Sequence, residues 1–220
     1  MSTNKQKRVG LFGGTFDPIH YGHLRAAEEI KEILSLDKVY FIPSAIPPHK
    51  SDSNITNSSK RLEMLKLAIE GNKYFDVSEF ELQSETPSYT IKTLEYFNDT
   101  EPNTQYYFIV GNEQFNHIES WKDYKGLFEL SNFAVITRPG FSEPSLNKVP
   151  LALKDDFLYY NCIENVISYT NKTKDIVFIE IKGIEISSTD IRAFVKSKKS
   201  IKYLVPDKVL NFILSEKLYD

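Results

Sequence analysis

The segment 9–24, VGLFGGTFDPIHYGHL, constrains this chain more than any other part of the sequence. It begins with an apolar strand expected over 9–12, turns at the adjacent glycines Gly13 and Gly14, and leads into a helix expected over 22–36. Glycine lets an anion approach the backbone closely, and a helix N-terminus favours negative charge through its N–H groups and its dipole. The segment therefore predicts a phosphate-binding site.

Two histidines at the start of this helix, His20 and His23, are candidate catalytic residues. They are three residues apart, so they share one face of the first helical turn. As hydrogen-bond donors they can stabilise the charge that develops on phosphate oxygens during phosphoryl transfer. Together with Asp17 they could instead be metal ligands, but the spacing differs from the H-E-x-x-H motif of zinc hydrolases. We expect phosphate binding and no metal site in the protein.

Composition excludes several classes of function. Lys and Arg number 27 against 30 Asp and Glu in a chain of 220 residues, which argues against a nucleic-acid-binding surface. The first residues lack the apolar core of a secretory signal, and no apolar run approaches the roughly 20 residues that span a bilayer. The single cysteine, Cys162, cannot form an internal disulfide, which is typical of proteins in a reducing cytoplasm.

Expected strands and helices alternate along the chain. The expected strands are 9–12, 39–42, 75–82, 106–110, 133–137 and 176–181. The expected helices are 22–36, 60–70, 88–97, 121–130, 186–196 and 206–218, with a further helix around 162–169 in the poorly patterned segment 142–173. This alternation predicts an α/β fold with a doubly wound parallel sheet, in a single domain over 1–220 that ends in a helical segment over 186–220.

Unusual motifs follow the expected strands, at the edge of the sheet where ligands bind in such folds. They are GGTFDPIHYGH, IPSAIPPHK, GNE, RPG and ISSTDIR. The last motif has a capping box that begins at Ser187, and its Ser188, Thr189 and Arg192 remain to form a second anion site. The convergence of these motifs predicts one binding site.

Two other residues are candidates for ligand contact. Trp121, the only tryptophan, can stack on a heteroaromatic ring, although a partly buried core position is its commoner role. Glu113 directly follows a buried strand, where its carboxylate can accept hydrogen bonds from ribose hydroxyls or simply favour the first turn of a helix. His117 has no supporting context, and we expect it at the surface.

Seven segments together resemble bacterial nicotinate-nucleotide adenylyltransferases of the HxGH nucleotidyltransferase superfamily. They are GGTFDPIHYGH, IPSAIPPHK, TPSYTIKTL, VGNEQFNHIESW, ITRPG, ISSTDIR and SIKYLVPDKVLNFI. The resemblance implies a Rossmann-like nucleotidyltransferase fold and adenylyl transfer from ATP to nicotinate mononucleotide. The products would be deamido-NAD (nicotinate adenine dinucleotide) and pyrophosphate, a step of NAD biosynthesis. Mg²⁺ would arrive on the ATP phosphates.

The resemblance also implies a role for each matching residue, with His20 and His23 catalytic. ATP would be bound by Gly13, Gly14, Thr15, Phe16, His20, His23, Ser188, Thr189 and Arg192. The mononucleotide would be bound by His49, Lys50, Tyr89, Thr90, Glu113 and Trp121. Tyr89 and Thr90 would contact the nicotinate carboxylate, and Trp121 would stack on the pyridine ring. Glu113 departs from the family pattern, which usually has aspartate there, and its extra methylene shifts the carboxylate by about one bond length.

Several alternatives stay open at this point. Pantetheine-phosphate adenylyltransferases and cytidylyltransferases share the first motif but would not carry the SYT and Trp121 elements together. The chain could prefer nicotinamide mononucleotide, since one carboxylate-to-amide change separates the two acceptors. It could be a non-catalytic nucleotide-sensing protein, against which His20, His23 and Arg192 argue, or a metal-dependent hydrolase. The sequence allows a homodimer without establishing the oligomeric state, and we expect no nucleic-acid or membrane partner.

Overall fold

The computed structural model describes residues 6–45, 55–84, 87–137, 149, 151–163, 166–171 and 173–220. Its strands are β1 (Lys7–Gly14), β2 (Lys38–Pro43), β3 (Phe75–Val77), β4 (Thr104–Gly111), β5 (Asn132–Thr137), β6 (Leu158–Ile163), β7 (Val166–Thr170) and β8 (Asp175–Glu180). Its α-helices are α1 (Tyr21–Ile33), α2 (Ser58–Ile69), α3 (Thr90–Thr100), α4 (Asn112–Phe115), α5 (Tyr124–Leu130), α6 (Ser188–Lys196) and α7 (Asp207–Ser215). Short 3₁₀ helices are η1 (Glu81–Gln83), η2 (Ile118–Ser120) and η4 (Leu151–Leu153). None of these described helices is long and apolar enough to cross a membrane.

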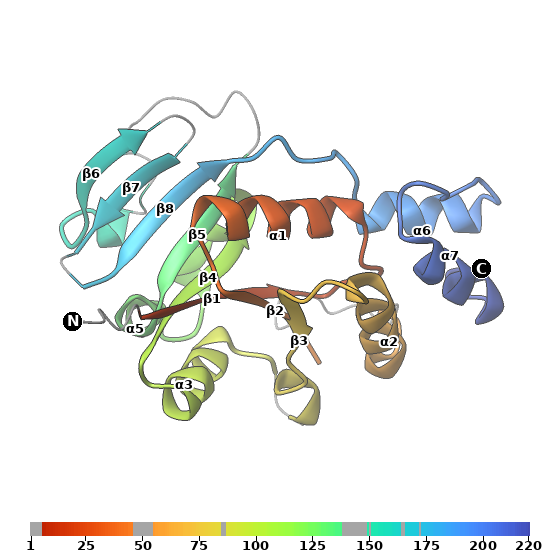
Figure 1. The fold of residues 1–220 in the computed structure, drawn as a ribbon, viewed down its shortest axis with the longest axis horizontal. Helices are drawn as coiled ribbons and strands as arrows, with labels where there is room; N and C mark the ends of the chain where they lie inside the picture. Colours follow the sequence, from red (N-terminus) through yellow and green to blue (C-terminus); the bar gives the residue numbers. More distant parts are fainter. Residues whose placement is uncertain are drawn as a thin grey trace.

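The described strands form one sheet in the order β3-β2-β1-β4-β5-β8-β7-β6 (Figure 1). The first six strands of this order are parallel, as predicted, whereas β7 and β6 are antiparallel additions at one edge. The chain moves outward from β1 to β3 and then returns to β4 on the other side of β1. The carboxyl ends of β1 and β4 therefore flank the topological switch point, where sheets of this kind bind ligands.

Three of the sequence predictions are wrong in detail. The helix expected around 162–169 is instead part of the antiparallel pair β6 and β7, in which Ile167 and Tyr169 are buried and their neighbours are not. This period of two is typical of a strand. The strand expected over 75–82 ends at Val77, and the chain then forms η1. The helix expected from Trp121 begins only at Tyr124.

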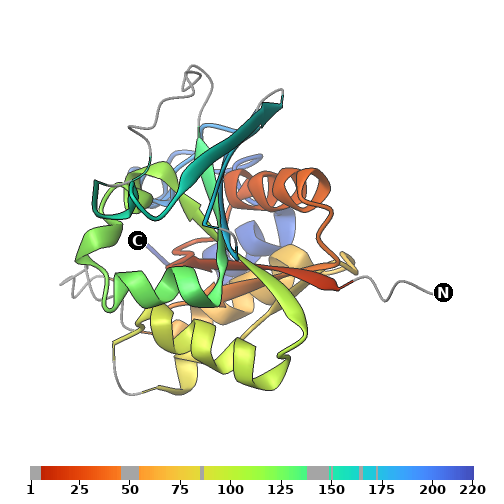
Figure 2. The same cartoon turned by 90° about the vertical axis from the view of Figure 1, so that its left-hand side faces the viewer.

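Two apolar layers cover the faces of the sheet. Val9 and Leu11 of β1 pack in the layer that contains α3 and α5, whereas Phe12 packs in the layer that contains α1 and α2. Figures 1 and 2 show α1 and α3 on opposite sides of the sheet. Helices α6 and α7 contribute Ile191 and Ile213 to the layer of α1. The C-terminal segment therefore packs beside the helix that carries both candidate histidines.

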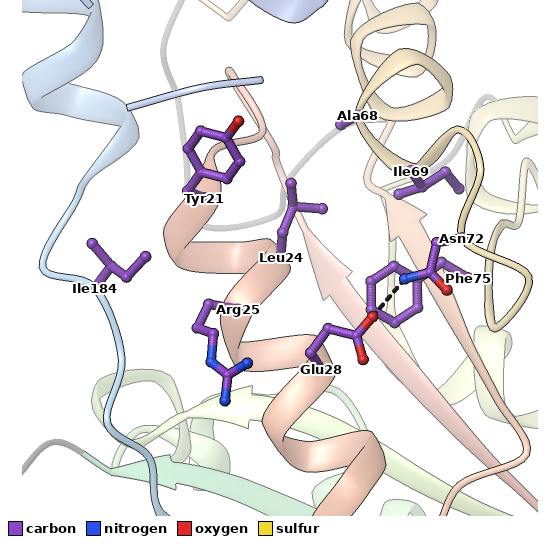
Figure 3. A pocket seen from close by; sticks show the side chains of 9 residues that line it. All are labelled: Tyr21, Leu24, Arg25, Glu28, Ala68, Ile69, Asn72, Phe75 and Ile184. Atoms are coloured by element: carbon purple, nitrogen blue, oxygen red, sulfur yellow. Dashed lines mark hydrogen bonds between the residues drawn. The ribbon is translucent and has the colours of Figure 1, made fainter. Parts of the chain in front are cut away.

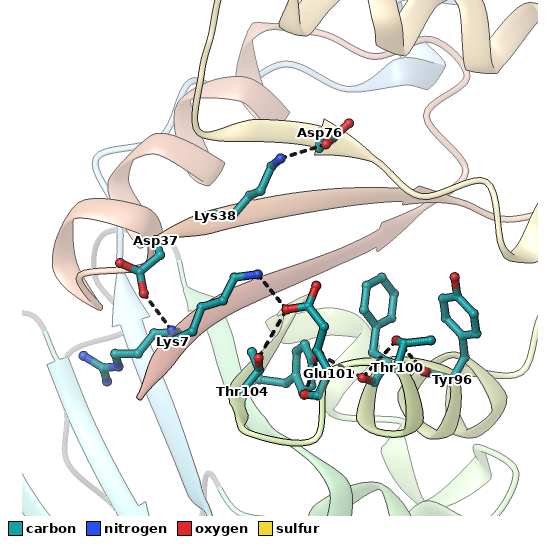
Figure 4. A network of polar contacts seen from close by, with 11 residues as sticks. Lys7, Asp37, Lys38, Asp76, Tyr96, Thr100, Glu101 and Thr104 are labelled. Atoms are coloured by element: carbon teal, nitrogen blue, oxygen red, sulfur yellow. Dashed lines mark hydrogen bonds and ion pairs between the residues drawn. The ribbon is translucent and has the colours of Figure 1, made fainter. Parts of the chain in front are cut away.

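Polar contacts at the start of β1 and β2 lie away from the predicted site (Figure 4). Lys7 Nζ is 2.6 Å from Glu101 Oε2, and Lys38 Nζ is 2.8 Å from Asp76 Oδ2. All four side chains keep substantial contact with solvent. Exposed pairs of this kind contribute about 0–1 kcal/mol each. They join β1 to the end of α3 and β2 to β3 without adding to the edge where the motifs gather.

Gly10 of β1 has little room above its Cα atom. A Cβ atom there would lie 2.9 Å from both Ile109 Cδ1 and Leu36 Cδ1. We expect Gly10→Ala to lower the free energy of unfolding by about 1–3 kcal/mol through overpacking. With free space, alanine would instead raise it by about 0.4–1 kcal/mol by restricting the unfolded chain. Urea denaturation measures the sign, and stabilisation would contradict this account of the packing.

Candidate active site

The loop after β1 is fixed by a buried aromatic side chain. Phe16 has a positive φ of 49°, and its ring packs against Phe12 and Phe41 in the core. A Cβ atom on Gly14 would be 2.8 Å from the Phe16 ring, so glycine is required at this approach. Because the Phe16 ring is buried, contact with ATP at this position would have to come from the backbone. The packing of Phe16 thus fixes the path of the chain from β1 to α1.

His20 caps α1 with its own side chain. Its Nδ1 accepts a hydrogen bond from the backbone N–H of His23 at 3.3 Å, which assigns the proton of the neutral ring to Nε2. The ring lies over Gly22, where a Cβ atom would be 2.9 Å from Nδ1, so a side chain at position 22 would displace the His20 ring. Burial lowers the pKa of His20 to about 4. At neutral pH this side chain is therefore an uncharged donor.

His23 stacks on His20, with the ring centroids 3.7 Å apart. The rings of Phe12 and Phe16 meet His23 edge-on, at centroid distances of 6.2 and 5.1 Å. Burial lowers the pKa of His23 well below its usual value, and the adjacent His20 lowers it further. Its Nδ1 is buried without a hydrogen-bond partner among the described residues. The two imidazoles form a neutral pair at the start of α1.

The start of α1 offers fewer free N–H groups than the sequence predicts. The N–H of Tyr21 donates to the carbonyl of Leu204 at 3.0 Å, and the N–H of His23 is held by His20. These contacts satisfy groups that a helix terminus otherwise leaves open. Anion binding here would consequently depend on the imidazoles and the helix dipole more than on backbone donors.

The ISSTDIR motif packs directly on the loop after β1. Ser188 Oγ donates to the carbonyl of Pro18 at 2.9 Å, although the two residues are 170 positions apart. Arg192 Nη1 donates to the carbonyl of Asp17 at 2.7 Å, and Arg192 Nη2 reaches Thr189 Oγ1 at 3.4 Å. Pro18 lies two residues before His20. The structure therefore brings both predicted anion-binding motifs to one place.

The buried guanidinium of Arg61, which the sequence interpretation missed, binds the loop after β1. Arg61 of α2 is only 1 % exposed and donates to three carbonyls. These belong to Thr15, Ser44 and Thr56, at 2.7, 2.8 and 2.8 Å. Thr15 follows β1 and Ser44 follows β2, so one side chain ties the ends of two neighbouring strands. The available signal was the position of Arg61 four residues before Leu65, on the apolar face of its helix.

The side chains considered as metal ligands do not converge. Both carboxylate oxygens of Asp17 are taken, by the N–H of Thr56 at 3.1 Å and by the hydroxyl of Tyr219 at 2.6 Å. His20 meanwhile uses Nδ1 to cap its helix. In the part of the chain that the structure describes, no three His, Cys, Asp or Glu side chains are grouped to hold a metal ion.

Tyr89 and Trp121, two of the residues predicted to bind the mononucleotide, pack against the apolar layer that contains α3 and α5. Tyr89 is the N-cap of α3 and Thr90 is its first residue. The ring of Trp121 meets Phe108 of β4 edge-on, with centroids 6.0 Å apart. Lys122 Nζ lies 4.4 Å from the centroid of the Tyr89 ring, which brings the Tyr89 and Trp121 segments side by side. The sequence interpretation did not single out Lys122.

Of the remaining predicted residues, the structure describes some and not others. Glu113 lies in the first turn of α4, directly after β4, and is exposed. Beside it, Asn112 Oδ1 is buried without a partner among the described residues, which makes it a further candidate contact. His117 is exposed, as expected. His49 and Lys50 lie outside the described residues.

An open apolar groove of about 270 Å³ lies between α1 and α2, apart from these residues (Figure 3). It is lined by Tyr21, Leu24, Arg25, Glu28, Ala68, Ile69, Asn72, Phe75 and Ile184. Asn72 Nδ2 donates to Glu28 Oε1 at 2.5 Å along one side of it. None of the lining residues belongs to the predicted site.

The profile of the cytidylyltransferase-like family matches residues 11–194. The chain belongs to this family. Two curated relatives, both called "Probable nicotinate-nucleotide adenylyltransferase", are similar over almost their whole length. That of Clostridium novyi (strain NT) is 39% identical over 213 residues, covering 97% of this chain and 99% of the relative. That of Geotalea daltonii (strain DSM 22248 / JCM 15807 / FRC-32) is 38% identical over 216 residues, covering 97% and 98%.

Within the family, this identity and coverage place the chain among the nicotinate-nucleotide adenylyltransferases, as the sequence motifs predict. A solved structure described as Plasmodium falciparum nicotinic acid mononucleotide adenylyltransferase complexed with NaAD has the same fold. It superposes with a TM-score of 0.72 at 22% identity, covering 97% of this chain and 98% of that chain. The predicted Rossmann-like nucleotidyltransferase fold is confirmed.

The lowered histidine pKa values predict a loss of stability on acidification. His20 has a pKa of about 4 when folded, and an ordinary value of about 6.5 when unfolded. Unfolding therefore takes up a proton within this window, and stability falls as the pH falls. We expect His20 alone to account for about 1 kcal/mol between about pH 7.5 and about pH 5.5.

His20→Asn isolates this contribution, because asparagine can accept the capping hydrogen bond but does not titrate. Urea denaturation across the same pH range should show a smaller loss for His20→Asn than for the unchanged protein. His117→Asn, at an exposed histidine, is the matched control and should keep the full pH dependence. Equal pH dependence in all three proteins would contradict the assignment.

Proposed function

We propose that this chain transfers the adenylyl group of ATP to nicotinate mononucleotide, giving nicotinate adenine dinucleotide and pyrophosphate. The observation that carries this proposal is the meeting of the His20–His23 pair with Ser188 and Arg192 at the loop after β1. That loop lies at the switch point of the sheet, where a nucleotide is expected. The names of the relatives support the choice of acceptor.

In this proposal the triphosphate binds between the starts of α1 and α6. Nε2–H of His20 donates to a phosphate oxygen, and Thr189 and the unused N–H groups of Arg192 bind from the other side. An oxygen of the mononucleotide phosphate bonds to the α-phosphorus, the bond to the β-phosphate oxygen breaks, and pyrophosphate leaves. The attacking phosphate is already anionic, so no general base is required. The protein contributes alignment and stabilisation of the developing charge.

Mg²⁺ enters this reaction as part of the ATP substrate. Magnesium commonly binds through substrate phosphates and keeps several waters. Asp17, the carboxylate nearest the phosphate loop in sequence, already accepts two hydrogen bonds from Thr56 and Tyr219. It therefore fits a structural role better than that of a resident metal ligand. Bound magnesium would neutralise charge on the leaving pyrophosphate.

The nicotinate ring would lie between Trp121 and the start of α3. There its carboxylate meets the positive end of the helix dipole at Thr90. Lys122 adds a positive charge beside Tyr89, which favours an acid over an amide. Glu113 would accept from ribose hydroxyls. A cytoplasmic location suits this chemistry and the exposed, unpaired Cys162.

Pyrophosphate release with ATP and Mg²⁺ tests the function directly. Nicotinate mononucleotide, nicotinamide mononucleotide and phosphopantetheine are compared as acceptors. We expect release with nicotinate mononucleotide and much less with the other two. Equal use of both pyridine nucleotides would keep the reaction but remove the account of carboxylate selection. Binding of ATP without release for any acceptor would support a nucleotide-sensing protein.

His20→Asn and His117→Asn provide the matched pair for this assay. His20→Asn keeps an acceptor for the N–H of His23 but lacks the Nε2–H that would donate to phosphate. We expect kcat to fall by about 100-fold or more, as for the loss of a donor to developing charge. His117→Asn, at the exposed histidine, should be unaffected. Normal turnover in His20→Asn would refute its catalytic role.

Lys122 should contribute to the choice of the acid. Lys122→Met removes the ammonium group but keeps the length of the side chain, so KM for nicotinate mononucleotide should rise by about 3- to 10-fold. KM for nicotinamide mononucleotide, whose amide group carries no charge, should change little. Lys125→Met, at an exposed lysine on α5, is the control for loss of one positive charge. The same change in KM for both acceptors, or in both variants, would count against Lys122.

A further inference from the structure

The carboxylate of Asp17 is buried, and the backbone carbonyl of the same residue contacts Arg192 of the ISSTDIR motif. The residue is 4 % exposed, and its two oxygens accept from the Thr56 N–H and the Tyr219 hydroxyl. Its own carbonyl accepts from Arg192 Nη1. Asp17 therefore joins three distant segments, and its side chain and backbone are used at the same time. The proposed reaction does not require this carboxylate to touch substrate.

Tyr219 reaches Asp17 from the next-to-last position of the chain, 202 residues away. The chain end is bent back toward the loop. Lys217 and Tyr219 have positive φ values of 50° and 70°, and the N–H of Leu218 donates to the carbonyl of Ile213 at 3.0 Å. A positive φ is unfavourable for residues other than glycine. Packing and hydrogen bonding must offset this cost, and the buried Leu218 and the Tyr219–Asp17 contact supply both.

We propose that Tyr219 is a positioning residue for ATP, which acts by holding Asp17 and, through it, the loop after β1 and Arg192. The phenolic hydroxyl fixes one carboxylate oxygen, so the Asp17 carbonyl stays directed at the guanidinium of Arg192. Without it the buried carboxylate has one unsatisfied oxygen and can rotate away. Arg192 and the turn before His20 would then lose their common support.

Neighbouring charges agree with this arrangement. Burial lowers the pKa of the Arg61 guanidinium, and the nearby Asp17 opposes part of this shift. Burial and the adjacent carboxylate raise the pKa of Tyr219, so the phenol stays protonated and donates at neutral pH. A tyrosine whose only task was to fill space would not need its hydroxyl aimed at a carboxylate. The contact thus extends the ATP site to the C-terminal end of the chain.

Tyr219→Phe tests the proposal, which rests on the proposed function for its kinetic arm. The variant keeps the ring and removes only the hydroxyl. We expect KM for ATP to rise by about 5- to 20-fold, since small displacements of aligned groups are costly. KM for nicotinate mononucleotide should change by less than about twofold, because the proposed site for it lies by the apolar layer that contains α3 and α5, away from Tyr219. Tyr203→Phe is the control, since Tyr203 is 76 % exposed and near the same C-terminal segment.

Asp17→Ala, which removes both acceptor oxygens, and the double variant with Tyr219→Phe test whether the tyrosine acts through the carboxylate. If it does, adding Tyr219→Phe to Asp17→Ala should change KM for ATP by less than about twofold. Independent effects in the double variant would overturn the proposal. So would Tyr219→Phe with unchanged KM for ATP, or with a lower melting temperature and equal losses for both substrates, which would indicate a purely structural role.

ATP binding gives a readout that does not depend on turnover. The rise in melting temperature on adding MgATP should be smaller for Tyr219→Phe than for the unchanged protein and for Tyr203→Phe. If the unchanged protein releases no pyrophosphate with any acceptor, the proposed function fails, but this measurement still decides the role of Tyr219. An equal rise in all three proteins would contradict that role.

Discussion

The geometry of the site depends on one buried carboxylate, that of Asp17, whose two oxygens both need hydrogen-bond donors. A buried charge without compensation costs several kcal/mol, so Asp17 can be buried only with donors on its oxygens and positive charge nearby. The Thr56 N–H, the Tyr219 hydroxyl and the Arg61 guanidinium meet these needs. This requirement links the loop after β1, the start of α2 and the end of the chain. The loop is consequently held by groups of the protein itself.

The chemistry of the histidine pair follows from a second consequence of burial. Two imidazolium rings with centroids 3.7 Å apart would repel one another, and the rings of Phe12 and Phe16 pack against one of them, His23. His20 and His23 therefore remain neutral donors. In the proposed reaction, positive charge for the triphosphate would come from elsewhere, from Arg192 and from magnesium bound to ATP. In this proposal the imidazoles supply directional hydrogen bonds, whereas Arg192 and magnesium supply the positive charge.

Local patterns were enough to predict the parallel core of the sheet and the helix at ISSTDIR. Ser187 is the N-cap of this helix, as predicted, and its Oγ accepts from the N–H of Asp190. The carboxylate of Asp190 accepts from the Ser187 hydroxyl. The pair β6 and β7 was missed because its short strands lie in a segment without clear periodicity. Arg61 and Tyr219 were missed for another reason. Their partners are up to 46 and 202 residues away. A local pattern could mark Arg61 as buried, but it could not identify the carbonyls that Arg61 binds or the carboxylate that Tyr219 contacts.

Selection between an acid and an amide acceptor can come from two sources that differ in physical character. The start of α3 provides N–H groups and a dipole fixed in the scaffold, which act at short range and in a defined direction. Lys122 provides an exposed charge on a flexible side chain, whose effect weakens as salt is added. Discrimination that persists at high ionic strength must therefore come from the helix start at Thr90. Discrimination that disappears with salt would instead come from Lys122.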